Sequence, residues 1–182
     1  MAKESLEYTE HLLALLTDVL HETITDRPLR EVSGEITPSL AQGLQFVYQH
    51  GACSMRDVAH GLSMTLPAAS QLVDRLVKKE WVTRSDNKED RRLSEIRLTD
   101  AGRRLAEAIR SKRVEGMSRI LDRMDAQHRR ALVESLESFI AAGIESADSA
   151  LETCSHCGTD HTPECVLNEL YRAATGTGIK RT

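Results

Sequence analysis

Four side chains with metal-ligand spacing lie near the carboxyl end of the chain. Cys154, Cys157, His161 and Cys165 form the pattern C-x2-C-x3-H-x3-C, and three of the chain's 4 cysteines fall in this segment. Three thiolates and one imidazole suit a tetrahedral ion of borderline softness. The spacing therefore predicts a zinc site, with His156 as a reserve ligand.

The sequence around these ligands fits such a site. Gly158 can take the left-handed conformation that turns backbone amides toward the sulfurs. Thr162 and Pro163 are predicted to start a helix that places Cys165 in its first turn, where the helix dipole favours a thiolate. Residues 152–164 have few apolar side chains besides the cysteines, so we expect a bound ion to order them.

Other interpretations of the Cys/His segment stay open. An iron–sulfur cluster would use the same thiolates, and a metal-free thiol switch needs no ion. A metalloenzyme, or a protein-interaction module built on the zinc knuckle, is also possible. However, four protein ligands close the zinc shell, and the sequence has no H-E-x-x-H motif or phosphate-binding loop. We therefore do not expect an enzyme.

A second set of candidate residues lies on two short amphipathic helices. Ser54 and Asp57 predict a capped first helix, and Thr65 with Pro67 predicts the start of a second. One face of the second helix is apolar and carries Ala69, Leu72, Val73, Leu76 and Val77. The other face carries Thr65, Ala68, Ser70, Gln71, Asp74, Arg75 and Lys78. Small polar residues followed by cations suit a helix in the major groove of DNA.

A charged hairpin follows these helices. Residues 81–83 and 93–98 have strand character, and the turn between them carries Lys88, Arg91 and Arg92 beside acidic residues. Such cations can enter the narrow, electronegative minor groove, although a solvated charged turn is the simpler alternative. Two helices and a hairpin in this order predict a winged helix-turn-helix that binds double-stranded DNA.

The distribution of charge agrees with DNA binding, although the formal net charge of the chain is −4. Residues 52–104 hold 11 Lys and Arg against 8 Asp and Glu, which gives +3. Residues 1–51 hold 3 against 8 (−5), and residues 105–182 hold 10 against 12 (−2). Affinity for DNA follows local phosphate contacts rather than total charge.

Long helices are expected on both sides of the helix-turn-helix. A first helix is predicted over residues 6–25, with a break at Arg27 and Pro28, and a second over residues 39–50. After Thr99 one long helix is expected, and Asp125 should start another whose apolar stripe continues to Leu151. Intramolecular packing could cover these stripes, but their width favours a homodimer.

The composition fits one soluble, mainly α-helical protein with a small β-wing. Of 182 residues, 40% are hydrophobic and 29% are charged. No apolar window reaches membrane-spanning length and the first residues are too polar for a signal peptide, so we expect a cytoplasmic protein with no membrane partner. The expected units are an N-terminal dimerisation helix (1–35), the winged helix-turn-helix (36–102), C-terminal dimerisation helices (103–151) and a metal-binding extension and tail (152–182).

The helix-turn-helix and wing residues resemble the MarR family of bacterial transcription regulators. The resemblance rests on the runs LSMT (62–65), LVDRL (72–76), WVTR (81–84), DRR (90–92) and LTDAG (98–102). It implies a dimeric winged helix-turn-helix that binds pseudo-palindromic DNA. It also implies a repressor that a small-molecule effector or thiol oxidation releases. The wing is about one residue longer than the commonest family wing, which leaves open whether Lys88, Arg91 or Arg92 reaches the groove.

Overall fold

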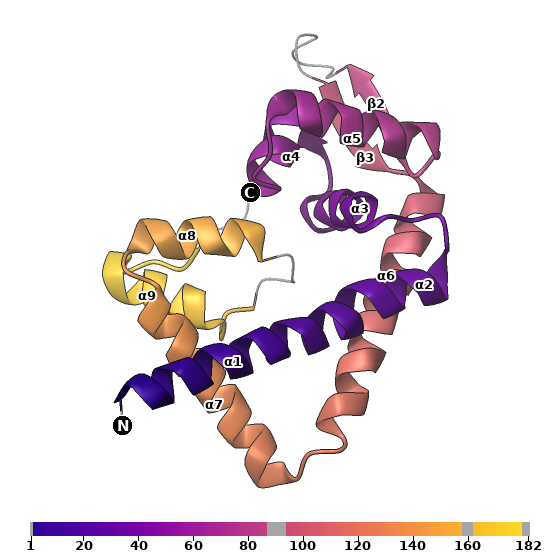
Figure 1. Ribbon diagram of the computed structural model, residues 1–182. Helices are drawn as coiled ribbons and strands as arrows, with labels where there is room; N and C mark the ends of the chain where they lie inside the picture. The colour runs from indigo at the N-terminus through magenta and orange to yellow at the C-terminus, as the bar shows by residue number, and fades with distance from the viewer. Residues whose placement is uncertain (1, 87–93, 158–161, 180–182) are drawn as a thin grey trace.

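The computed structural model describes residues 2–86, 94–157 and 162–179, and it is mainly helical with one small antiparallel sheet (Figure 1). This confirms the predicted fold class. The helices are α1 (Ala2–His21), the π-helical turn η1 (Glu22–Asp26), α2 (Arg27–Val32), α3 (Pro38–His50), α4 (Met55–Gly61), α5 (Leu66–Lys78), α6 (Asp100–Leu121), α7 (Ala126–Gly143), α8 (Ala147–His156) and α9 (Val166–Thr175). The strands are β1 (Cys53–Ser54), β2 (Val82–Asp86) and β3 (Ser94–Leu98), in the order β1-β3-β2.

The helix-turn-helix consists of α4 and α5 and begins with the predicted caps. The amide of Ser54 donates to Asp57 Oδ2 at 2.7 Å, and the amide of Asp57 donates to Ser54 Oγ at 3.2 Å. Thr65 caps α5 by accepting from the amide of Ala68. Four of the five predicted apolar positions of α5 are buried, whereas Val77 lies at the edge of the stripe and is 37% exposed. That part of the prediction was wrong.

The sheet contains a strand that the sequence pattern did not predict. β1 has two residues and pairs with β3 through Cys53 opposite Ile96, while β2 pairs with the other edge of β3. Ile96 is fully buried in the main core, which is formed by α3, α4, α5, α6 and the sheet. β1 is too short to show the alternation by which a strand is recognised in a sequence.

The predicted break at Arg27 and Pro28 is wrong. The chain continues from α1 through η1 into α2, with Pro28 in the first turn of α2, where its missing amide breaks no helical hydrogen bond. Pro28 and the neighbouring Leu29 are buried, and α2 packs along α6. The proline therefore lies at a change of helix type that does not interrupt the helical path of the chain.

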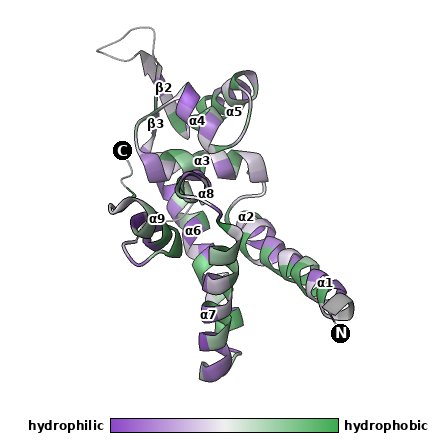
Figure 2. Ribbon diagram, turned by 90° about the vertical axis from the view of Figure 1, so that its left-hand side faces the viewer, coloured by the Kyte–Doolittle hydropathy of each residue, from purple (hydrophilic) through white to green (hydrophobic). Residues whose placement is uncertain are grey.

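The predicted helix from Asp125 to Leu151 is two helices. Asp125 caps α7 as expected, but α7 ends at Gly143, and Ser146 caps the separate helix α8. Within the described residues α7 has no buried side chain, and in both views α1 and α7 project away from the core (Figures 1 and 2). No helix in the described ranges is long and apolar enough to cross a membrane.

The wing joins α6 at a tightly packed junction. Thr99 caps α6 by accepting from the amide of Gly102 at 3.0 Å, and its hydroxyl donates to the carbonyl of Glu80 at 2.7 Å. A Cβ atom on Gly102 would overlap the carbonyl oxygen of Trp81. Only glycine therefore lets the first turn of α6 lie against the start of the wing.

We predict that Gly102→Ala destabilises the protein. Because the overlap is with backbone, α6 must shift, and such overpacking typically lowers the free energy of unfolding by about 1–3 kcal/mol. The matched control is Gly143→Ala in α7, since a Cβ there meets nothing within 4 Å. Chemical denaturation of both variants checks this, and equal stability would contradict the described junction.

Candidate nucleic-acid interface

The outer face of α5 presents the residues that the sequence assigned to DNA. Thr65, Ala68, Gln71, Arg75 and Lys78 are exposed, while Ser70 is half-buried beside the core residue Ala69. Burial of the opposite stripe fixes this orientation. The α5 face is therefore available to a groove over the length of the helix.

Two neighbouring cations are held by carboxylates, whereas Arg75 and Lys78 are not. Arg84 Nη1 lies 3.6 Å from Asp74 Oδ1, and Lys79 Nζ lies 3.1 Å from Glu35 Oε2. Within the described ranges Arg75 and Lys78 have no ion-pair partner. Their charges are thus available to DNA phosphates, whose neutralisation by arginine and lysine supplies much of a protein's affinity for DNA.

The wing carries a second charged pair at its base. Arg97 donates to both oxygens of Glu95 at 2.9 and 2.8 Å, and this pairing raises the pKa of the Arg97 guanidinium. Lys88, Arg91 and Arg92, the residues predicted to reach the minor groove, lie outside the described residues. The structure thus describes the two strands of the wing but not the cations predicted to contact DNA.

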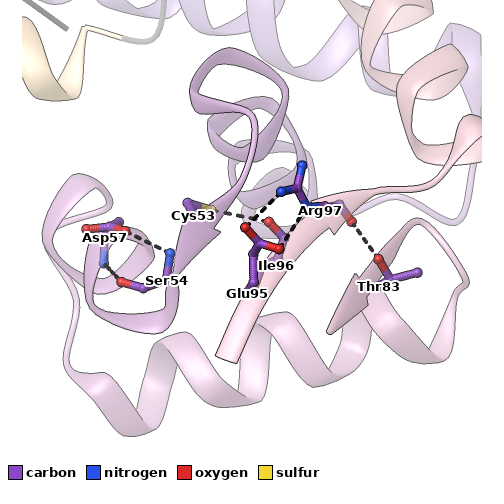
Figure 3. A network of polar contacts seen from close by, with 7 residues as sticks. All are labelled: Cys53, Ser54, Asp57, Thr83, Glu95, Ile96 and Arg97. Carbon is purple, nitrogen blue, oxygen red and sulfur yellow. Dashed lines mark hydrogen bonds and ion pairs between the residues drawn. The ribbon is translucent and has the colours of Figure 1, made fainter. Parts of the chain in front are cut away.

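We call the unit formed by α3, α4, α5 and the sheet the head. Cys53 is buried in its core, next to Ile96 (Figure 3). Its thiol donates to the carbonyl of Ile96 at 3.9 Å. Burial, followed by the nearby charges of Asp57 and Glu95, raises the pKa of Cys53 to about 12. The thiol is therefore protonated and packs as a small apolar group.

The three C-terminal cysteines occupy different environments. Cys154 is buried on α8 against Leu167 and Ile179, Cys165 is half-buried next to them, and Cys157 is exposed. His161 lies outside the described residues. In the described part of the chain no group of three or more His, Cys, Asp or Glu residues could hold a metal ion. The predicted four-ligand site is therefore not supported by the described residues.

One expectation about this segment needs correction, and one feature of it was not predicted. The helix predicted to start at Thr162 begins at Val166, with Cys165 at its N-cap, because residues 163–164 form a turn first. The segment also has a small apolar core of its own, since Leu167 and Ile179 pack against Cys154. This apolar cluster was not predicted because Ile179 lies far along the chain from Cys154, and the bound ion stays a prediction.

His156, which the sequence suggested as a reserve metal ligand, instead contacts the helix-turn-helix. Its Nε2 donates to the carbonyl of His60 at 3.1 Å and lies 3.4 Å from Ser63 Oγ. Ser63 has a φ of 50°, a conformation rare outside glycine, two residues before the cap of α5. The C-terminal extension thus touches the turn of the helix-turn-helix. No sequence pattern could have shown this contact, which joins residues about 90 positions apart.

A cavity of about 660 Å³ lies between the head, α6 and the end of α8. Its wall includes Gln45 of α3 and Arg113 of α6, and in the described structure Gln45 Oε1 and Arg113 Nε are buried without hydrogen-bond partners. Burial lowers the pKa of the Arg113 guanidinium, and no described carboxylate pairs with it. Sequence analysis missed both residues, because a lone arginine on an amphipathic helix is usually solvent-exposed.

Comparison with known proteins points to one family. Residues 36–94 match the model of the MarR family. The uncharacterized HTH-type transcriptional regulator YwhA of Bacillus subtilis (strain 168) is 25% identical over 117 residues, which cover 64% of this chain and 79% of YwhA. The matched segment contains the helix-turn-helix and most of the wing, so this part of the chain is similar to the DNA-binding region of MarR-family transcription regulators.

Solved structures share the fold. A MarR family protein from Bacillus stearothermophilus superposes with a TM-score of 0.68 and 19% identity, covering 80% of this chain and 99% of that one. Streptococcus pneumoniae FabT in complex with DNA superposes with a TM-score of 0.63 and 19% identity, covering 75% of this chain and 94% of FabT. About a fifth of this chain has no counterpart in the first of these structures.

We predict that Cys53 makes stability depend on pH above the ordinary thiol pKa. Because the folded protein holds this proton more tightly than the unfolded chain, the stabilisation is complete below pH 9.0 and is lost as the pH rises toward about 12. Urea denaturation across the lower part of this window should show the stability difference between wild type and Cys53→Ala narrowing. The exposed Cys157→Ala serves as control, and parallel pH profiles for wild type and Cys53→Ala would contradict the prediction.

Proposed function

We propose that this chain, through its MarR-family winged helix-turn-helix, acts in the cytoplasm as a homodimeric repressor that binds a pseudo-palindromic operator. The observation that carries the proposal is the exposed face of α5, which ends in two cations that have no carboxylate partner among the described residues. The similarity to FabT, whose structure was solved in complex with DNA, supports it. A dimer bound across a promoter would exclude polymerase from it, which is why repression is the proposed sign of regulation.

Each part of the interface has a proposed role. Thr65, Ala68, Ser70 and Gln71 face base edges in the major groove, where the first turns of a recognition helix lie. Arg75 and Lys78 contact phosphates. Lys88, Arg91 and Arg92 form the wing tip that enters the minor groove, where arginine is favoured by the narrow groove's negative potential.

The DNA contacts can be separated by their salt and sequence dependence. Arg75→Ala or Lys78→Ala should weaken binding evenly across DNA sequences and reduce the salt slope by about one. Gln71→Ala should relax one base position at a cost of about 1–3 kcal/mol. Arg172→Ala on α9 is the charge-matched control. Affinities are measured by fluorescence anisotropy on operator and random DNA, and unchanged operator affinity in an Arg91→Ala/Arg92→Ala variant would refute the wing assignment.

The homodimer is proposed from apolar side chains that one chain leaves uncovered. α1 and α7 carry many of them, and Figure 2 shows hydrophobic residues along both helices. Phe139 of α7 is 60% exposed. The exposed large apolar residues of these two helices are Leu6, Tyr8, Leu12, Leu13, Leu15, Val19, Val133, Leu136, Phe139 and Ile140. An exposed apolar surface on two projecting helices fits a second copy of the chain, since a two-fold axis pairs identical faces.

A charge in this surface should prevent assembly. Leu136→Glu or Leu16→Glu is expected to give unfolded, aggregated or monomeric protein, because the carboxylate would be buried without a partner. Arg130→Ala, an exposed change on the same helix as Leu136, should leave the dimer intact. Light scattering measures the mass, and a stable wild-type monomer at micromolar concentration would overturn the proposal.

The proposed effector is a small apolar carboxylate. The cavity between the head and α6 offers the desolvated Arg113 guanidinium, and aliphatic side chains of Ile24, Val114 and Met117 line the same space. A carboxylate would pair with this guanidinium and compensate for its loss of hydration. Because α3, α6 and the helix-turn-helix turn all contribute to the wall, a bound ligand would act on the orientation of the head.

A metal ion is a second proposal, which the ligand spacing supports. Cys154, Cys157, His161 and Cys165 would hold one zinc ion per chain, with an iron–sulfur cluster as the alternative. The structure places Cys154 and Cys165 in one small apolar cluster, so two of the four ligands lie on neighbouring elements. The proposed role is structural, because zinc would fasten the start of α9 to the end of α8.

Metal analysis of purified protein, with an absorption spectrum, tests this site. Zinc is expected at one ion per chain, and a brown chromophore would indicate a cluster instead. Chelation or Cys157→Ser should speed proteolysis after Leu151 and leave DNA affinity unchanged, whereas Cys53→Ala should retain the metal. A change in operator affinity of about tenfold on metal loss would assign a sensory role. Anaerobically purified protein with neither zinc nor iron would refute the site.

A further inference from the structure

A second cavity, of about 490 Å³, lies where the C-terminal extension meets the head. His50, Cys53 and Asp57 line it on the head side, and Leu151 and Cys154 line it on the α8 side. It borders the Arg113 cavity, with which it shares Phe46, Gly61 and Ser155. Part of its wall is therefore formed by α8 and by the chain after α9, which follow the long helices α6 and α7 in the sequence.

Two polar groups of this cavity, on His50 and Asp57, offer hydrogen-bond acceptors. His50 Nδ1 lies 2.9 Å from the carbonyl oxygen of Phe46, and since a carbonyl can only accept, Nδ1 carries the proton and Nε2 is left as an acceptor. Asp57 uses Oδ2 in the capping box, and Oδ1 has no hydrogen-bond partner among the described residues. A ligand that fits these groups must donate hydrogen bonds.

The charge of the wall is negative and its remaining surface is aromatic or aliphatic. Among the described residues the lining includes one carboxylate, that of Asp57, and no lysine or arginine. The rings of Phe46 and His50 stack with centroids 4.1 Å apart, and Leu151 and Ile179 lie on the opposite side. Aromatic faces and a carboxylate together favour a cation with an apolar body.

We propose that this cavity binds a small organic cation, a protonated amine on an aromatic or aliphatic body. The ammonium group pairs with Asp57 and donates to His50 Nε2, while the body packs between Phe46 and the side chains of Leu151 and Ile179. This site is separate from the reading face of α5 and from Arg113. Its occupation also stabilises the contact between α8 and the head, because the ligand bridges both walls.

The charge preference is tested by calorimetry on the full-length protein with three probes of similar size. We expect 2-phenylethylammonium to bind once per chain and neutral 2-phenylethanol to bind about tenfold more weakly or not at all. Anionic 3-phenylpropanoate should use the Arg113 cavity, so Arg113→Leu should abolish its binding and leave that of the amine unchanged. Equal affinity for the amine and the alcohol would overturn the proposal, whereas failure of the carboxylate alone would overturn only the proposed effector site.

Two variants locate the amine. Asp57→Asn keeps an oxygen for the cap of α4 but removes the charge, and Leu151→Trp fills the cavity while leaving the cap intact. Each should weaken amine binding by about tenfold. Asp100→Asn, an exposed acid in the first turn of α6, is the matched control and should bind normally. Circular dichroism confirms the fold, and unchanged amine affinity in both cavity variants would refute the site.

Limited proteolysis gives an independent readout. Because Leu151, Cys154 and Ile179 form one wall, the amine should slow cleavage of residues 145–179 in the wild type and not in Leu151→Trp. The alcohol serves as the negative control. Cleavage at the same rate with and without saturating amine would show that the ligand does not bridge the extension and the head.

Discussion

Burial of one stripe of α5 is the constraint on which the rest of the head depends. Ala69, Leu72, Val73 and Leu76 are almost completely buried, and the close approach of Leu72 to Gly43 leaves α3 and α5 little freedom to slide. A rotation of α5 would expose this stripe and bury cations, and each buried leucine stabilises the fold by about 1.5–3 kcal/mol. The orientation of the polar face is therefore set by packing on the other side of the helix.

The junction of Glu80, Trp81, Thr99 and Gly102 transmits this orientation to the long helices. The hydroxyl of Thr99 donates to the carbonyl of Glu80, just after α5, and accepts from the amide of Gly102 in the first turn of α6. The two ends of the wing therefore lie next to each other. The head and the long helix α6 are therefore in direct contact at this junction. A ligand between them, or in the cavity beside α8, can act on the head only by changing how these two bodies pack.

The elements predicted correctly are those whose determinants are local. Four helix starts were predicted from their N-cap residues, because a cap involves only a few neighbouring residues. These residues are Ser54, Thr65, Thr99 and Asp125. Two of the missed features involve distant partners: β1 forms because Cys53 pairs with Ile96, and the C-terminal segment is covered by Ile179. The candidate DNA residues follow from helical periodicity, whereas Arg113 and His156 acquire their roles only from tertiary contacts.

The π-helical turn η1 has a consequence for how the first helix is aimed. A π-turn accommodates one extra residue, and one residue rotates the direction of all preceding side chains by about 100° relative to a continuous α-helix. The turn packs on α6. A Cβ atom added to Gly116 of α6 would lie 3.0 Å from the carbonyl oxygen of Thr23. The side chains of α1 therefore point in directions different from those they would have if α2 continued as one α-helix. Insertion or loss of a single residue here would redirect the whole apolar surface of α1, so the phase of this helix is a simple evolutionary route to a different partner.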